Sequence, residues 1–93
     1  MFERILRRIR DRVRTGRYIV TVHGWREMLA DDLMLSEVWE VVMTGRVTER
    51  QRDPRTTEWK YLIEGRTVDG RTVTVVTKLG PTGRLVVITV YRS

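Results

Sequence analysis

Residues 58–91 read EWKYLIEGRTVDGRTVTVVTKLGPTGRLVVITVY, and this stretch decides the fold. In its first segment aromatic and apolar side chains recur at every second position, which is the period of a strand. Asp69-Gly70 is a strong signal for a hairpin turn. Gly80-Pro81-Thr82-Gly83 marks a second short connection. The stretch therefore predicts an antiparallel meander with strands at 58–64, 72–79 and 84–91.

A further strand is expected immediately before this meander. Arg46–Arg50 has the character of a strand. Asp53-Pro54 then turns the chain, because proline fixes its backbone angle and cannot donate to a strand ladder. The predicted sheet therefore has four strands.

The amino-terminal segment predicts an amphipathic helix. Its apolar residues recur at intervals of three and four, at Phe2, Ile5, Leu6, Ile9 and Val13. Thr15-Gly16 supplies the stop, since glycine is favoured just beyond a helix end. The β-branched segment 18–22 that follows is an extended link or a brief strand.

Two more helices are expected before the strands. One begins near Thr21 or His23 and runs to about Ala30. The next starts after Ser36, which is a good N-cap, and closes at Thr44-Gly45. Helices that precede strands predict an α+β domain, with N-terminal helices packed on one face of a four-stranded, mainly antiparallel sheet.

The length of 93 residues predicts a single domain, 1–93. Within it, residues 1–16 form the basic amphipathic helix and residues 17–92 form the α+β core. Both sides of the last two predicted strands are fairly apolar. The second sheet face is therefore expected to be partly covered, or to pair with another subunit in a homodimer.

The net charge of +6 is concentrated at the amino terminus. Residues 1–17 hold arginines at 4, 7, 8, 10, 12, 14 and 17 against only Glu3 and Asp11. A basic helix on a nearly neutral body attracts nucleic acid, an acidic protein partner or a membrane surface. The alternative interpretation is a solvated face in an arginine-rich chain.

The composition excludes several chemistries. There is no cysteine, so the chain has no disulfide and no thiol nucleophile. One histidine and no paired-carboxylate spacing leave no metal site, and no motif indicates a cofactor. No apolar run approaches the roughly 20 residues of a membrane-spanning helix. We therefore expect a cytoplasmic protein without metal, cofactor or membrane partner.

His23 and Tyr91 are the candidates for acid–base chemistry. His23 is the only histidine, and histidine titrates near neutrality without environmental help. Thr89 lies two residues before Tyr91, so the two hydroxyls project from one strand face and could meet the same phosphate. The structural alternative is a helix-capping histidine and an edge tyrosine. Lys60 and Lys78, the only lysines, lie on strands and either hold phosphate or keep a sheet face soluble.

The stretch His23-Gly24-Trp25-Arg26-Glu27-Met28, read with the closing strand Val87-Ile88-Thr89-Val90-Tyr91-Arg92, resembles the bacterial family called domain of unknown function 4258. That family is similar in fold to the RelE/ParE-type toxins. The resemblance covers about residues 17 to 92. Family members often carry a basic residue where this chain has Glu27, and Arg26 is the cation that could replace it.

The resemblance implies a toxin-like, metal-independent ribonuclease. His23 and Tyr91 would be the acid–base pair, and Lys60, Arg26 or Lys78 would hold the phosphate. The alternative is a non-enzymatic module that binds nucleic acid, RNA included, or an acidic protein through the arginine-rich first helix, with Arg7, Arg10 and Arg14 as the contacts. A third hypothesis is a ParE-like inhibitor of a protein target. Toxins of this type are usually neutralised by an antitoxin, here expected to be acidic.

Overall fold

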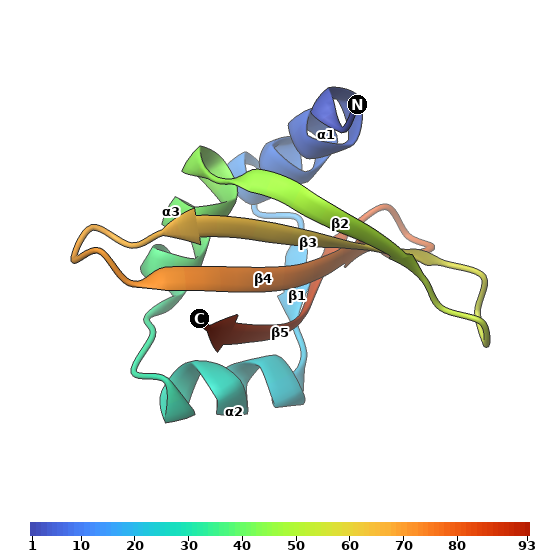
Figure 1. Ribbon diagram of the computed structural model, residues 1–93. Helices are drawn as coiled ribbons and strands as arrows, with labels where there is room; N and C mark the ends of the chain where they lie inside the picture. The colour runs from blue at the N-terminus through green and yellow to red at the C-terminus, as the bar shows by residue number, and fades with distance from the viewer.

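The computed structural model describes residues 1–93 and confirms an α+β architecture (Figure 1). The helices are α1 (Glu3–Arg14), α2 (Val22–Ala30) and α3 (Leu35–Thr44). The strands are β1 (Tyr18–Val20), β2 (Arg46–Arg52), β3 (Trp59–Arg66), β4 (Thr72–Leu79) and β5 (Leu85–Arg92). They form one five-stranded sheet in the order β1-β5-β4-β3-β2.

The prediction of four strands was wrong, because β1 joins the sheet. Tyr18 lies opposite Leu85 and Val20 lies opposite Val87, in a parallel pairing with β5. The pairs β2–β3, β3–β4 and β4–β5 are antiparallel, which confirms the predicted meander. The sheet is therefore mixed, with the shortest strand at one edge and β2 at the other.

The helices do not all cover one sheet face. α3 packs on β3 and β4, and α1 packs on α3. Instead of joining them, α2 runs along the edge of the sheet beside β5 (Figure 1). The buried core lies between the sheet and the helices and consists of Ile9, Met28, Leu33, Val38, Val41, Val42, Ile63, Val73, Val75, Leu85, Val87 and Val90.

The second sheet face is already covered at its centre within the single chain. Leu62 and Val76 pair across β3 and β4 on this face, and they are only 7% and 8% exposed. Tyr91 is exposed on this face, but most of the exposed large apolar side chains lie elsewhere. Three of them, Val22, Trp25 and Leu29, lie on α2.

Thr21 joins the sheet edge to the start of α2. Its backbone N–H donates to the Val87 carbonyl at 3.0 Å, and its hydroxyl donates to the Ile88 carbonyl at 2.7 Å. The same hydroxyl accepts from the Gly24 N–H at 2.9 Å, so Thr21 is the N-cap. This bonding confirms the predicted helix start and fixes α2 against β5.

The start of α3 differs from the prediction. Ser36 was expected to cap this helix, but the helix begins at Leu35 and Met34 occupies the N-cap position. The Glu37 carboxylate accepts from the Met34 N–H at 2.9 Å. A carboxylate in the first turn therefore does the capping that the sequence assigned to a serine hydroxyl.

Gly45 ends α3 as predicted, but the reason is close approach rather than a left-handed backbone. Its φ is −84°, which any residue adopts. A Cβ at this position would lie 2.4 Å from the Glu64 carbonyl oxygen and 2.5 Å from the Val41 carbonyl oxygen. Gly65 on β3 faces it, since a Cβ there would lie 3.1 Å from the Gly45 Cα. The two glycines let the end of α3 touch β3.

Arg71 ties the β3–β4 turn to the connection between α2 and α3. Its guanidinium donates to the Asp32 carbonyl at 2.8 Å and forms ion pairs with Glu37 and Asp69. The Asp69 carboxylate also accepts a hydrogen bond from the Thr67 hydroxyl. That bond first, and Arg71 second, lower the pKa of Asp69 below its usual range.

Gly45→Ala should destabilise the protein by about 1–3 kcal/mol, because the new methyl group overpacks a contact made of backbone atoms. The measurement is the free energy of unfolding in urea. Gly80→Ala is the matched control, because its Cβ would meet nothing closer than 3.4 Å. Equal stability of Gly45→Ala and wild type would contradict the described contact between α3 and β3.

Asp69 should make stability fall in acid. Because its pKa is lower in the folded chain than in the unfolded chain, its contribution is complete above the unfolded pKa and is lost as pH falls through the folded pKa. The urea midpoint of unfolding should therefore differ less between pH 7 and pH 3 in Asp69→Asn than in the wild-type protein. Glu40→Gln removes an exposed carboxylate whose oxygens accept no hydrogen bond, and serves as the control. An unchanged difference in Asp69→Asn would refute the assignment.

Candidate functional site

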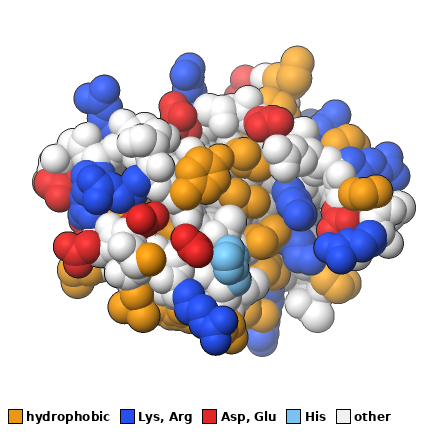
Figure 2. Space-filling model, turned by 60° about the horizontal axis from the view of Figure 1, so that its bottom comes forward, with side chains coloured by type: hydrophobic (Ala, Val, Ile, Leu, Met, Phe, Trp, Pro, Cys, Tyr) orange, Lys and Arg blue, Asp and Glu red, His pale blue; other side chains and the backbone are white.

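His23 lies on the exposed part of α2 with a carboxylate beside it. Gly24 and Met28 are the buried residues of this helix and face β5 and the core. His23 and Glu27 are one helical turn apart, and the His23 Nε2 lies 3.9 Å from the Glu27 Oε1. The His23 side chain is 65% exposed. Figure 2 shows the histidine at the surface with acidic side chains next to it.

Tyr91 lies on the sheet face that points away from the core. Its neighbour Val90 is fully buried among the core residues, so Tyr91 projects to the opposite side. Along this face Tyr91 is opposite Thr74, which is opposite Glu64, which in turn is opposite Arg46. This cross-strand row, Tyr91–Thr74–Glu64–Arg46, carries a phenol at one end and a guanidinium at the other.

The structure places His23 and Tyr91 on neighbouring elements without joining them. No hydrogen bond links the two side chains, and the Tyr91 hydroxyl has no partner within the chain. α2 and β5 run in the same direction from the Thr21–Ile88 bond (Figure 1). With rises of about 1.5 Å per helical residue and about 3.3 Å per strand residue, Tyr91 lies roughly 7 Å farther along than His23.

Thr89 lies nearer to the histidine end of β5 than Tyr91 does. It is opposite Val76, one row before the Tyr91 row on the same sheet face. Its hydroxyl makes only a long hydrogen bond of 3.5 Å to the Val90 carbonyl. Thr89 therefore remains available to a ligand at this face.

The two lysines lie on the same sheet face as Tyr91, but far from it. Lys78 is four residues along β4 from Thr74, the partner of Tyr91, which corresponds to about 13 Å. Its ammonium group is paired with Glu58 at 3.2 Å. Lys60 pairs with Gln51 on β2, one strand farther still from β5. Neither lysine is brought to the histidine or the tyrosine.

Arg26 lies on the outward side of α2. It makes no hydrogen bond or ion pair with the rest of the chain. Its helix exposes Trp25 and Leu29, which are 45% and 79% exposed. The cation therefore stands on a partly apolar outer surface rather than next to Tyr91.

The arginines of α1 divide into two groups. Arg10 donates to the Val42 carbonyl at 3.0 Å and to the Gly45 carbonyl at 2.9 Å, so it caps the end of α3. Arg12 donates to the Gly83 carbonyl at 2.7 Å. The second group makes no hydrogen bond or ion pair through its guanidinium groups and is exposed: Arg4, Arg7, Arg8 and Arg14.

Two arginines of β2, Arg50 and Arg52, continue this cationic surface, and the sequence did not point to them. Arg50 lies over the Trp59 ring at 4.1 Å from its centroid, and Arg52 lies at 5.3 Å. Arg46, at the start of the strand, lies opposite Glu64 and projects to the other sheet face. The sequence does place Arg50 and Arg52 at alternate positions of β2, opposite the aromatic residues of β3. Their membership of the cationic surface could not be predicted from this pattern, because it depends on α1 lying beside β2.

Two surface hollows lie within this cationic region. One of about 260 Å³ runs along α1 and is lined by Glu3, Leu6, Arg7, Arg10 and Arg14. One of about 320 Å³ lies between α1 and the β2–β3 pair and is lined by Met1, Phe2, Arg4, Ile5, Arg8, Arg50 and Tyr61. Both combine arginines with apolar side chains.

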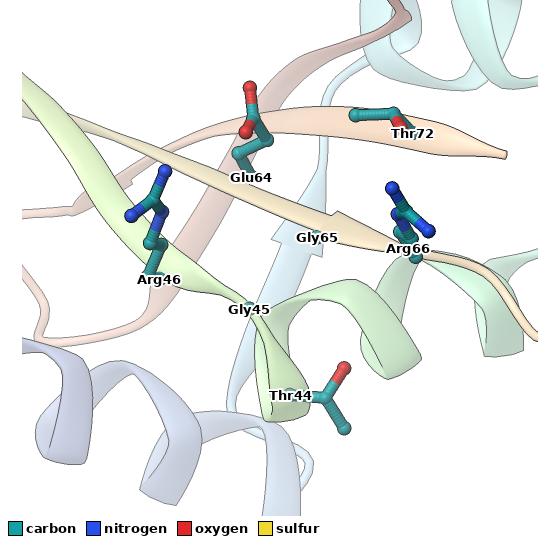
Figure 3. A pocket seen from close by; sticks show the side chains of 7 residues that line it. All are labelled: Thr44, Gly45, Arg46, Glu64, Gly65, Arg66 and Thr72. Carbon is teal, nitrogen blue, oxygen red and sulfur yellow. The ribbon is translucent and has the colours of Figure 1, made fainter. Parts of the chain in front are cut away.

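A third hollow of about 450 Å³ lies where α3 meets β2 and β3 (Figure 3). Its lining has no apolar side chain and consists of Thr44, Gly45, Arg46, Glu64, Gly65, Arg66 and Thr72. Figure 3 shows the side chains of Arg46, Glu64 and Arg66 projecting to one side of the strands. Glu64 stands between the two guanidinium groups, so the local charge is mixed.

The histidine and carboxylate side chains form no group of three or more that could hold a metal ion. None of the helices has the length and apolar character needed to cross a lipid bilayer.

These features define a small basic α+β domain whose first helix and outer strand form one arginine-rich surface. Residues 20–92 match the family described as "Domain of unknown function (DUF4258)", and the chain belongs to this family. The matched segment excludes α1. No curated protein and no solved structure gave a significant match.

Proposed function

We propose that the protein binds nucleic acid through the α1–β2 surface, which consists of Arg4, Arg7, Arg8, Arg14, Arg50 and Arg52. The observation that supports this proposal is the absence of any carboxylate partner for these guanidinium groups. Glu3 is the only carboxylate that lines the hollows between α1 and its neighbours. Neutralising phosphates with such cations releases condensed counterions and drives binding.

The dimensions and composition of the surface favour a nucleic acid over an acidic protein. α1 has 12 residues and is therefore about 18 Å long, while one strand of B-form DNA presents a phosphate about every 3.4 Å. Free arginines occur along this whole length, from Arg4 to Arg14. Aromatic rings lie among the cations, and bases can stack on them.

Replacing Arg7 and Arg14 by alanine should weaken binding and flatten its salt dependence. Each lost phosphate contact lowers the slope of log K against log salt by about 0.7–0.9, so the double variant should lose about 1.5. Fluorescence anisotropy with a labelled oligonucleotide at several salt concentrations measures both quantities. Neither side chain has an intramolecular partner, so the fold should be unaffected.

Arg26→Ala/Arg84→Ala is the matched control, because it removes the same charge from exposed positions outside the α1–β2 surface. It should bind almost as tightly as wild type. An equal loss in both double variants would show that only net charge matters. Wild-type protein that fails to bind any oligonucleotide at low salt would refute the proposal.

A ribonuclease activity at His23 and Tyr91 is a second candidate. The exposed His23 with Glu27 beside it, and a Tyr91 hydroxyl with no partner on the adjoining strand, favour it. The likeness of the family to RelE/ParE-type toxins motivates the same idea. The nearby charges are less suitable, since Glu27 lies beside His23 and Glu64 lies in the same cross-strand row as Tyr91, whereas both lysines lie farther along the sheet.

If this activity exists, wild-type protein should cleave RNA in the presence of a chelator, and His23→Gln should be slower by at least about 100-fold. Tyr91→Phe should show a comparable loss. Both variants should still bind oligonucleotides through the α1–β2 surface. RNA that stays intact with wild-type protein, alone and in a translating extract, would exclude the activity. Growth arrest that survives His23→Ala would indicate a protein target instead.

A further inference from the structure

We infer that the hollow between α1 and the β2–β3 pair binds one unpaired nucleotide, so that the protein prefers single-stranded to double-stranded nucleic acid. This inference rests on the proposed nucleic-acid binding and goes beyond it by naming the form of the ligand. The hollow has a volume of about 320 Å³, at the lower end of the range for small-molecule sites. Its lining contains no carboxylate.

One wall of the hollow is aromatic and apolar. Phe2 and Tyr61 meet edge to face, with ring centroids 6.5 Å apart and an interplanar angle of 78°. Both residues are only half-buried, so part of each ring remains exposed to the hollow. Ile5 adds an aliphatic surface. Such a wall suits the flat face of a base, and stacking of this kind tolerates any base identity.

The Tyr61 hydroxyl makes no hydrogen bond within the chain. It can donate to a base or accept from one. The wall therefore offers a polar group beside its apolar surface, as sites for planar ligands commonly do.

The other wall of the hollow is cationic, and its arginines come from both α1 and β2. Arg4 and Arg8 are one turn apart on α1, so they lie on the same side of the helix. Arg50 approaches from β2, directly across from Tyr61. Its guanidinium rests on Trp59 at 4.1 Å from the ring centroid, which restricts the side chain before any ligand arrives. A phosphate next to a stacked base would find donors on both sides.

This arrangement discriminates between single and double strands. In a duplex the faces of each base are stacked on neighbouring bases, so no base face is free to stack on the aromatic wall. An unpaired nucleotide can place its base against Phe2 and Tyr61 while its phosphate meets the arginines. The phosphate contacts are common to both forms, whereas the stacking contact is available only to the single strand.

The test compares three labelled oligonucleotides by anisotropy at one salt concentration: a single strand, its duplex, and the same strand with abasic sites in place of its bases. Wild-type protein should bind the single strand on the order of 10-fold more tightly than either of the others. Phe2→Leu keeps the apolar volume but removes the ring, so this variant should lose the preference and retain duplex binding. Arg50→Lys keeps the charge but removes the planar guanidinium, so it should weaken binding of the single strand and the duplex alike and leave the preference unchanged.

Trp25→Leu removes an exposed aromatic side chain from α2 and is the control, which should keep the preference. Equal affinity of wild-type protein for the single strand and the abasic strand would overturn the inference. If that binding still depended on Arg7 and Arg14, the proposed nucleic-acid function would stand. Absence of binding to all three oligonucleotides would overturn both.

Discussion

The contact between Arg10 and the end of α3 fixes the part of the molecule on which the proposed function depends. The last carbonyl groups of a helix have no partner within the helix and carry partial negative charge. Arg10 satisfies this requirement by donating to the carbonyls of Val42 and Gly45. Because Ile9 is fully buried next to it, polar and apolar contacts together hold α1 in place. The position of α1 then places its remaining arginines beside β2.

The same arrangement gives the arginines different tasks. The guanidinium groups of Arg10 and Arg12 donate hydrogen bonds to backbone carbonyls, so these two residues stabilise the fold. Arg4, Arg7, Arg8 and Arg14 have no such partners and remain available to a ligand. The region around His23 and Tyr91 lacks a comparable cluster of free cations. A carboxylate lies beside His23, and Lys78, on the same sheet face as Tyr91, is paired with Glu58. Charge therefore favours the α1–β2 surface as the place where a polyanion binds.

Much of this fold was predictable, because its signals are local. Alternation and turn residues located the meander, and Gly70 and Gly83 adopt the positive φ that such turns require. β1 was left undecided because three residues carry little periodicity and their parallel partner lies far along the chain. The candidate site was only partly predictable. The basic helix was evident, but the task of Arg10 and the nearness of Arg50 to Tyr61 and α1 depend on tertiary packing.

Binding at the α1–β2 surface is measured most directly by an NMR titration of the labelled protein with a short single-stranded oligonucleotide. Amide signals of α1 and β2, with those around Tyr61, should shift most as ligand is added. Signals of α2 and of the end of β5 around Tyr91 should move little. Large shifts at His23 and Tyr91, with α1 unaffected, would contradict binding at the α1–β2 surface and place the ligand beside α2 and the end of β5.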